Sequence, residues 1–101
     1  MAVQLVSLAK VTVTTKGTAV AASATVQNAT AVYITAPSTN TGAIWVGDAN
    51  VLNSSGRGTQ VAKGTTLTLY ARGEMIDLEK IFIDADNNND IATITYLKKV
   101  T

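Results

Sequence analysis

Oxygen-bearing side chains alternate in the C-terminal part of the chain, at Asp84, Asp86 and Asn88. This spacing matches the first half of a calcium-binding loop, in which alternate residues supply oxygen ligands. The rest of that pattern is missing, because the sixth position is not Gly and the twelfth is not a bidentate Glu. Clustered carboxylates also repel one another unless a cation neutralises them. We therefore interpret residues 84–90 as a hairpin turn, with a weak calcium site as the alternative.

Catalytic chemistry has few side chains to use. The chain contains no His and no Cys, which removes the imidazole base, the thiolate nucleophile and thiolate metal sites. The carboxylates that could pair for glycoside hydrolysis are Asp48, Glu74, Asp77 and Asp84. No pattern places two of them across a cleft, and Asp77 instead suits the first turn of a short helical segment. The sequence predicts no catalytic residue, no cofactor and no metal site, and we expect that the protein is not an enzyme.

Two groups of residues could contact a partner. Gly56, Arg57 and Gly58 form a flexible segment that lacks the ending of a phosphate-binding loop, and its single cation suits a contact between subunits. Trp45 and Tyr33 lie on the parity opposite the β-branched residues of their strands, so both rings could stack on a sugar. The alternative is that these few large rings fill the core.

The elements that would position these residues are strands. Thr, Val and Ile make up 34 of the 101 residues, and these types suit pleated strands. Short strand-like runs are separated by turn residues throughout, which is typical of antiparallel sandwiches. We predict an all-β fold with a single domain over residues 1–101. It should be an antiparallel β-sandwich, jelly-roll-like or Ig-like, of about seven or eight short strands, with at most one short helical turn near residues 76–80.

Alternation within the runs predicts which side chains face the core. In the first strand-like run, residues 3–14, the apolar positions shift by one residue around Lys10. Such a shift moves apolar side chains to the other face, which indicates a bulge or two shorter strands there. Residues 18–27 are expected to form a strand, with a helix as the competing prediction because the segment is rich in Ala. Trp45 should point away from its neighbours Ile44 and Val46.

The composition points to assembly. Only 15% of the residues are charged, against about 25% in an average domain, while 47% are hydrophobic. So small a domain has few charges with which to break up exposed apolar patches. The first of the seven acidic residues is Asp48, so the N-terminal half carries no negative side chain. That half is therefore the better candidate for burial against copies of the chain or another partner.

Charge and hydropathy also exclude some partners. The net charge is +1 and no basic stripe occurs, so nucleic acid is not expected to bind. No apolar stretch is long enough to span a membrane, and the first ten residues do not have the pattern of a signal peptide. We expect synthesis in the cytoplasm and no membrane partner.

Four segments resemble small β-sandwich virion proteins of tailed bacteriophages, which decorate or cement the head. They are residues 41–51 (TGAIWVGDANV), 63–69 (KGTTLTL), 77–85 (DLEKIFIDA) and 91–97 (IATITYL). The resemblance implies a structural protein, often trimeric, held on the lattice of the major capsid protein. It also implies that Gly47, Asp48, Gly64, Asp77 and Leu78 serve the fold.

These observations together predict a capsid decoration or cement protein on the virion surface. Its interface with the major capsid protein, and with further copies of the chain in a homotrimer, is expected to use the apolar N-terminal strand and the long loop. The residues assigned to that interface are Val3, Leu5, Asn50, Val51 and Arg57. The alternative is a host-binding module at a tail or fibre tip that recognises surface glycan through Trp45 and Tyr33.

Overall fold

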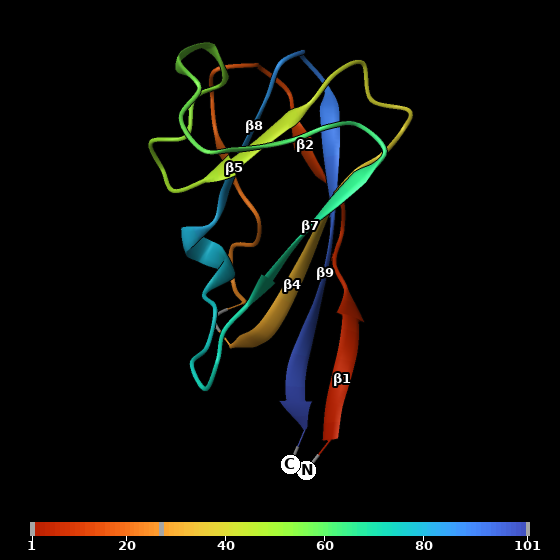
Figure 1. Ribbon diagram of the computed structural model, residues 1–101, viewed down its shortest axis with the longest axis vertical. Coiled ribbons are helices and arrows are strands. Elements are labelled where there is room, and N and C mark those ends of the chain that lie inside the picture. Colours follow the sequence, from red (N-terminus) through yellow and green to blue (C-terminus); the bar gives the residue numbers. More distant parts are fainter. Residues whose placement is uncertain (1, 27, 101) are drawn as a thin grey trace.

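The chain forms two antiparallel β-sheets packed face to face (Figure 1). The computed structural model describes residues 2–26 and 28–100. The strands are β1 (Ala2–Ser7), β2 (Val11–Val13), β3 (Val20–Ala21), β4 (Ala29–Ala36), β5 (Ile44–Gly47), β6 (Thr59–Val61), β7 (Thr65–Tyr70), β8 (Phe82–Ala85) and β9 (Asp90–Val100). Two single 3-10 turns complete the described elements, η1 (Asn53–Ser55) and η2 (Leu78–Lys80). The predicted all-β sandwich is confirmed.

The first sheet is built around the longest strand, β9. Its strand order is β1-β9-β4-β7, and β2 pairs with β9 beyond the end of β1. The second sheet has the order β3-β8-β5-β6. Strands that follow one another in sequence therefore often lie in different sheets. Among the strands of the described residues, only β5 and β6 are consecutive in sequence and also paired with each other.

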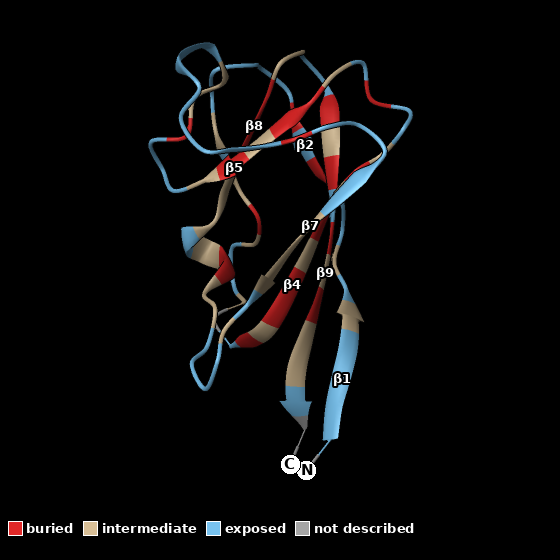
Figure 2. Ribbon diagram, in the orientation of Figure 1, coloured by how far each residue is buried: buried red, intermediate tan, exposed pale blue. Residues whose placement is uncertain are grey.

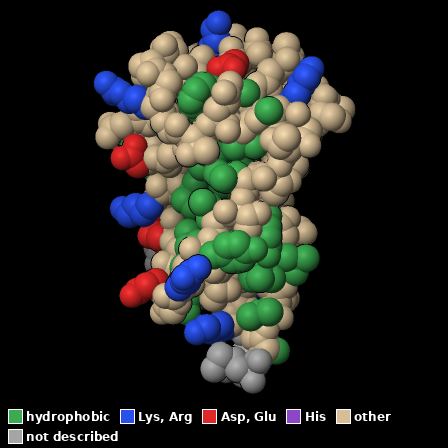
Figure 3. Space-filling model, in the orientation of Figure 1, with side chains coloured by type: hydrophobic (Ala, Val, Ile, Leu, Met, Phe, Trp, Pro, Cys, Tyr) green, Lys and Arg blue, Asp and Glu red, His purple; other side chains and the backbone are tan. Residues whose placement is uncertain are grey.

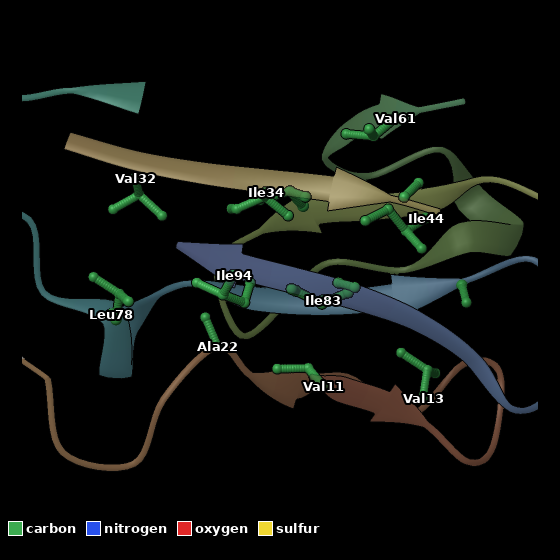
Figure 4. Packing of buried hydrophobic residues seen from close by; sticks show 14 of the residues in the cluster. Val11, Val13, Ala22, Val32, Ile34, Ile44, Val61, Leu78, Ile83 and Ile94 are labelled. Carbon is green, nitrogen blue, oxygen red and sulfur yellow. The ribbon is translucent and has the colours of Figure 1, made fainter. Parts of the chain in front are cut away.

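The core lies between the two sheets, where the β-branched side chains of both meet. Figure 4 shows Ile34 and Ile94 of the first sheet pointing towards Ile44 and Ile83 of the second, and all four are almost fully buried. Leu78 of η2 closes one end of this layer and is also fully buried. The alternation predicted from the sequence is correct, because the residue between two buried neighbours in β5 is only partly buried.

The N-terminal run is divided as its parity change indicates. β1 and β2 are separate strands on the same side of β9. Val6 is partly buried and packs against the core, whereas Val11 and Val13 are buried. The apolar residues that face the core thus switch from even to odd numbers between the two strands, and with this split the described residues form nine strands.

Residues 84–90 are not a hairpin, which corrects the sequence-based prediction. β8 pairs with β3 and β5, whereas β9 belongs to the other sheet. The connection crosses from one sheet to the other, with Asn89 at a φ of 67° and its N–H donated to the Val13 carbonyl. Asn tolerates this left-handed conformation in either kind of turn, so the turn composition does not distinguish the two.

Two shorter segments also differ from expectation. Among the described residues 18–26, only Val20 and Ala21 pair as a strand, and the last position of the predicted strand, residue 27, lies outside the described residues. A 3-10 turn at residues 53–55 was not expected, whereas the turn near residue 78 was. Asp77 caps that second turn by accepting a hydrogen bond from the Glu79 N–H at 2.9 Å, as its position predicts.

Candidate interaction surface

The outer face of the first sheet carries a row of apolar side chains. Leu5 pairs with Leu97, Leu97 with Ala31, and Ala31 with Tyr70, so one row crosses all four strands. Leu5 is 62% exposed and Tyr70 is 73% exposed, whereas the small Ala31 between its larger neighbours is buried. Val3, 58% exposed, and Tyr33 lie beside this row on the same face. We call the set the apolar face: Val3, Leu5, Ala31, Tyr33, Tyr70 and Leu97.

The apolar face occupies only one end of the sheet. Towards the other end the outward positions are threonines, and the Oγ1 atoms of Thr35 and Thr66 lie 2.8 Å apart in a hydrogen bond. Figure 3 shows hydrophobic side chains gathered over the lower half of the visible surface, in the region of β1, β4 and β9. This is the end at which β1 begins and β9 ends (Figure 1).

β1 forms an open edge beside the apolar face. Within the described residues it pairs only with β9, and five of its six residues are exposed (Figure 2). Edge strands are usually protected by charged side chains or by Pro. The sequence of β1, AVQLVS, contains neither. An exposed apolar edge of this kind is a site for pairing with another chain.

The backbone of β1 directs specific groups towards this edge. The Leu8 N–H donates to the Ile94 carbonyl at 3.0 Å, and hydrogen-bonded pairs alternate along an antiparallel ladder. Gln4 and Val6 therefore belong to the pairs that bond with β9. The N–H and C=O groups of Val3, Leu5 and Ser7 point away from β9, into the open edge.

The outer face of the second sheet is covered by the chain's own loops. Asp84 lies on this face and is fully buried. Its Oδ1 accepts a hydrogen bond from the Gly17 N–H at 2.8 Å, and its Oδ2 accepts one from the Asn53 N–H at 2.8 Å. One carboxylate thus holds two loops, residues 14–19 and 48–58, over the sheet.

The 48–58 loop packs closely because two glycines allow it. A Cβ atom on Gly47 would lie 3.2 Å from the Val51 Cβ, and one on Gly58 would lie 2.7 Å from the Val51 Cγ2. Val51 is consequently buried at 4% exposure. This corrects its assignment to a partner interface, since its side chain fills the loop's own interior.

The two predicted contact regions are not brought together. Asn50 and Arg57 are exposed on the 48–58 loop, while Val3 and Leu5 are exposed on β1. Figure 1 shows this loop at the opposite end of the molecule from β1, and the long axis measures 42 Å. A partner that contacts both regions must therefore span the molecule or be two different neighbours.

The alternating oxygen ligands near residue 86 serve loops rather than a shared centre. Asp86 Oδ1 accepts from the Trp45 Nε1–H at 2.8 Å, and Asn88 Oδ1 accepts from the Lys16 N–H at 2.9 Å. With Asp84 engaged as described, the three side chains face three different sets of donors. In the described part of the chain, no cluster of three or more His, Cys, Asp or Glu residues is placed to hold a metal ion, and no pocket is present.

Two further buried polar residues, Asn40 and Asp90, hold the loop of residues 37–42 in place. Asn40 donates from Nδ2 to the Ile91 carbonyl at 2.8 Å and accepts from the Ile91 N–H at 3.0 Å, as a neighbouring strand would. Asp90 accepts from the N–H groups of Thr41 and Gly42. Among the described residues, every buried side-chain polar atom has a hydrogen-bond partner, so the polar groups at this end stabilise the loops.

The aromatic residues do not form a common stacking platform. Trp45 points outward from the second sheet and Tyr33 points outward from the first, since each alternates with inward-facing neighbours. The two rings therefore lie on opposite faces of the sandwich. Tyr70 and Leu97 were not predicted as contact residues, although both share the parity of outward threonines in their strands.

Comparison of the chain with protein families, with curated proteins and with solved structures found no match in any of the three. The described residues include no helix long and apolar enough to cross a membrane.

Proposed function

We propose that this protein is a non-enzymatic structural component of a phage virion, a decoration or cement protein that binds the major capsid protein and stabilises the head. The observation that carries the proposal is the apolar face together with the open β1 edge. Soluble monomers seldom leave such a surface bare, so a partner that covers it accounts for the sequence better than a ligand pocket does. The resemblance of four segments to phage virion proteins supplies the kind of partner.

The two ends of the molecule suit two different contacts in this role. The apolar face and β1 offer hydrophobic area and free backbone groups at one end. At the other end, the exposed Asn50 and Arg57 sit on a loop that Asp84 holds in place. A decoration protein must join neighbouring capsomers, and a molecule 42 Å long with a contact region at each end can do so. The protein would be made in the host cytoplasm and act on the capsid surface.

Particle binding tests this proposal. The double substitution Tyr70→Ser and Leu97→Ser removes the large apolar side chains that β7 and β9 contribute to the apolar face, without touching the buried core. We expect its occupancy on phage heads assembled without the protein to fall at least about tenfold, as for loss of an interface anchor. Thr68→Ser with Thr95→Ser is the matched control on the same sheet, and its occupancy should not change. Equal occupancy of both variants would refute the role of the apolar face.

A further inference from the structure

The β1 edge is complementary to itself. Val3, Leu5 and Ser7 present the free backbone groups, so a strand added here must form its hydrogen-bonded pairs with these residues. In an antiparallel pair of two β1 strands centred on Gln4, Val3 lies opposite Leu5 of the other copy and Gln4 lies opposite Gln4. Apolar residues then meet apolar ones on the outer face, and the two amides meet on the two-fold axis. Centring on Leu5 instead would place Val3 opposite Ser7 and Gln4 opposite Val6, which mixes polar with apolar.

We propose that two copies of this chain associate through β1, antiparallel and centred on Gln4, so that the first sheet continues from one copy into the other. The contact is isologous, and closure about a two-fold axis uses both β1 edges at once. It therefore gives a dimer that does not propagate. The apolar faces of the two copies become one continuous surface across the joined sheet.

Charge favours a second copy as the occupant. β1 contains no charged residue, so pairing brings no like charges into direct contact. Among the described residues, the cationic side chains nearest to β1 are those of Lys98 and Lys99, which lie on β9 and pair with Gln4 and Val3. In the dimer the two β9 strands are separated by three strand spacings, about 14 Å, which exceeds the screening length of about 8 Å at physiological salt.

The other edges are less suited to this contact. β3 has two residues and β6 has three, which is too short for a stable pairing. β7 is as long as β1, but four of its six residues are Thr or Tyr, and its outward positions are Thr66, Thr68 and Tyr70. A head-to-tail contact between β1 and β7 would build the ring that a trimer requires, and the experiment below separates that arrangement from the two-fold pair.

Disulfide trapping tests the register directly, because the chain has no cysteine of its own. In the proposed dimer, the two copies of residue 4 form a non-hydrogen-bonded pair with Cα atoms about 4.5 Å apart, within the range that a disulfide spans. We expect Gln4→Cys to form a covalent dimer under mild oxidation at least about tenfold faster than Leu5→Cys, whose copies lie on a longer diagonal. Thr66→Cys, exposed on the β7 edge of the same sheet, is the matched control and should remain monomeric.

Contrary outcomes are equally specific. Equal rates for Gln4→Cys and Thr66→Cys would mean random collision and would overturn the proposal. Faster trapping of Leu5→Cys would overturn the register. A disulfide between residues 4 and 66, in an equimolar mixture of Gln4→Cys and Thr66→Cys, would overturn the two-fold pair in favour of a head-to-tail ring.

The unmodified protein provides a second measurement. An interface of two short strands is small, so we expect a weak dimer, with the mass rising from 10.5 kDa towards twice that value as the concentration increases from about 10 µM to about 1 mM. Leu5→Lys should hold the mass at the monomer value, whereas Tyr70→Lys should not. A constant monomer mass for the unmodified chain would contradict the pairing. Both measurements use purified protein without phage heads, so their failure is separate from failure of head binding.

Discussion

The outer faces of the two sheets differ in how far the chain's own loops cover them. The second sheet is covered by loops that the buried Asp84 carboxylate holds through Gly17 and Asn53. On the first sheet, no described loop covers the apolar face, where Leu5 and Tyr70 are more than half exposed. The same small chain thus covers one face internally and leaves the other available.

This difference separates residues that stabilise the fold from residues that are free to serve a contact. Asp84 and Asp90 are buried and accept hydrogen bonds from backbone N–H groups of loops, and the buried Asn40 holds its own loop to the Ile91 backbone of β9. The loss of any of the three should therefore destabilise the fold. Leu5, Leu97 and Tyr70 contribute little to the core of the lone subunit, so their loss should affect association instead. Substitutions can test the two faces independently.

The largest effect is expected for Asp84→Ala. The change leaves the part-buried N–H groups of Gly17 and Asn53 without their acceptor, and the loss of a hydrogen bond to a charged group costs about 1.5–3 kcal/mol. We predict a decrease of about 3 kcal/mol in the free energy of unfolding, measured by urea denaturation. Asp48→Ala, at an exposed carboxylate that accepts from the Asn50 N–H within its own loop, is the control. If both substitutions cost the same, Asp84 does not hold the loop cover.

A smaller loss is expected for Gly58→Ala. Gly58 has a φ of +114°, and an added Cβ would lie 2.7 Å from the Val51 Cγ2 and 2.9 Å from the Val46 carbonyl oxygen. We predict destabilisation of about 2 kcal/mol, the cost of one strained residue, in the same denaturation assay. Gly56→Ala also places Ala at positive φ but meets nothing within 4 Å, so it should cost less. Equal costs would show that the tight packing of Val51 is unimportant.

On the uncovered face we predict almost no change in stability. Tyr70→Ser should alter the free energy of unfolding by less than about 0.5 kcal/mol, as surface substitutions usually do. Leu69→Ser, the adjacent residue on the inner side of β7 that packs against the core, should cost several times more. A large loss for Tyr70→Ser would mean that the apolar face stabilises the monomer itself.

The smallest effect concerns single amides of β1. In dilute solution the N–H groups of Gln4 and Val6 should exchange with solvent deuterium more slowly than those of Val3 and Leu5. The N–H groups of Gln4 and Val6 are bonded to β9, whereas those of Val3 and Leu5 face the open edge. Amide exchange followed by NMR measures this directly. Raising the protein concentration should slow Val3 and Leu5 selectively if copies pair along this edge. Uniform exchange along β1 would contradict the assigned alternation.

The sequence predicts those features that depend on local alternation. Ile44 and Val46 are buried on either side of Trp45, and Ile94 and Tyr96 face inward, because a period of two fixes the face of every residue in a strand. The division of the first run near Lys10 follows from the same rule. Local patterns were therefore sufficient to assign the inward face of these strands.

Features that depend on strand order could not be predicted in this way. Asp84 occurs in an acidic, Asn-rich segment that reads as an exposed turn, yet two distant loops bury it. Val51 looked available for a partner because nothing in its own segment reveals the contacts with Gly47 and Gly58. That β1 forms an edge, and that Tyr70 and Leu97 lie in line with Leu5, depends on pairing between segments far apart in the sequence.

The central position of β9 has a consequence for how the protein is made. β1, β2 and β4 all pair with this one strand, and it follows every one of them along the chain. During translation, none of these pairings can form until residues 90–100 have left the ribosome. The newly made segment before them holds its Val, Ile and Leu residues without their principal partner, so its solubility at that stage depends on how quickly synthesis is completed or on chaperones.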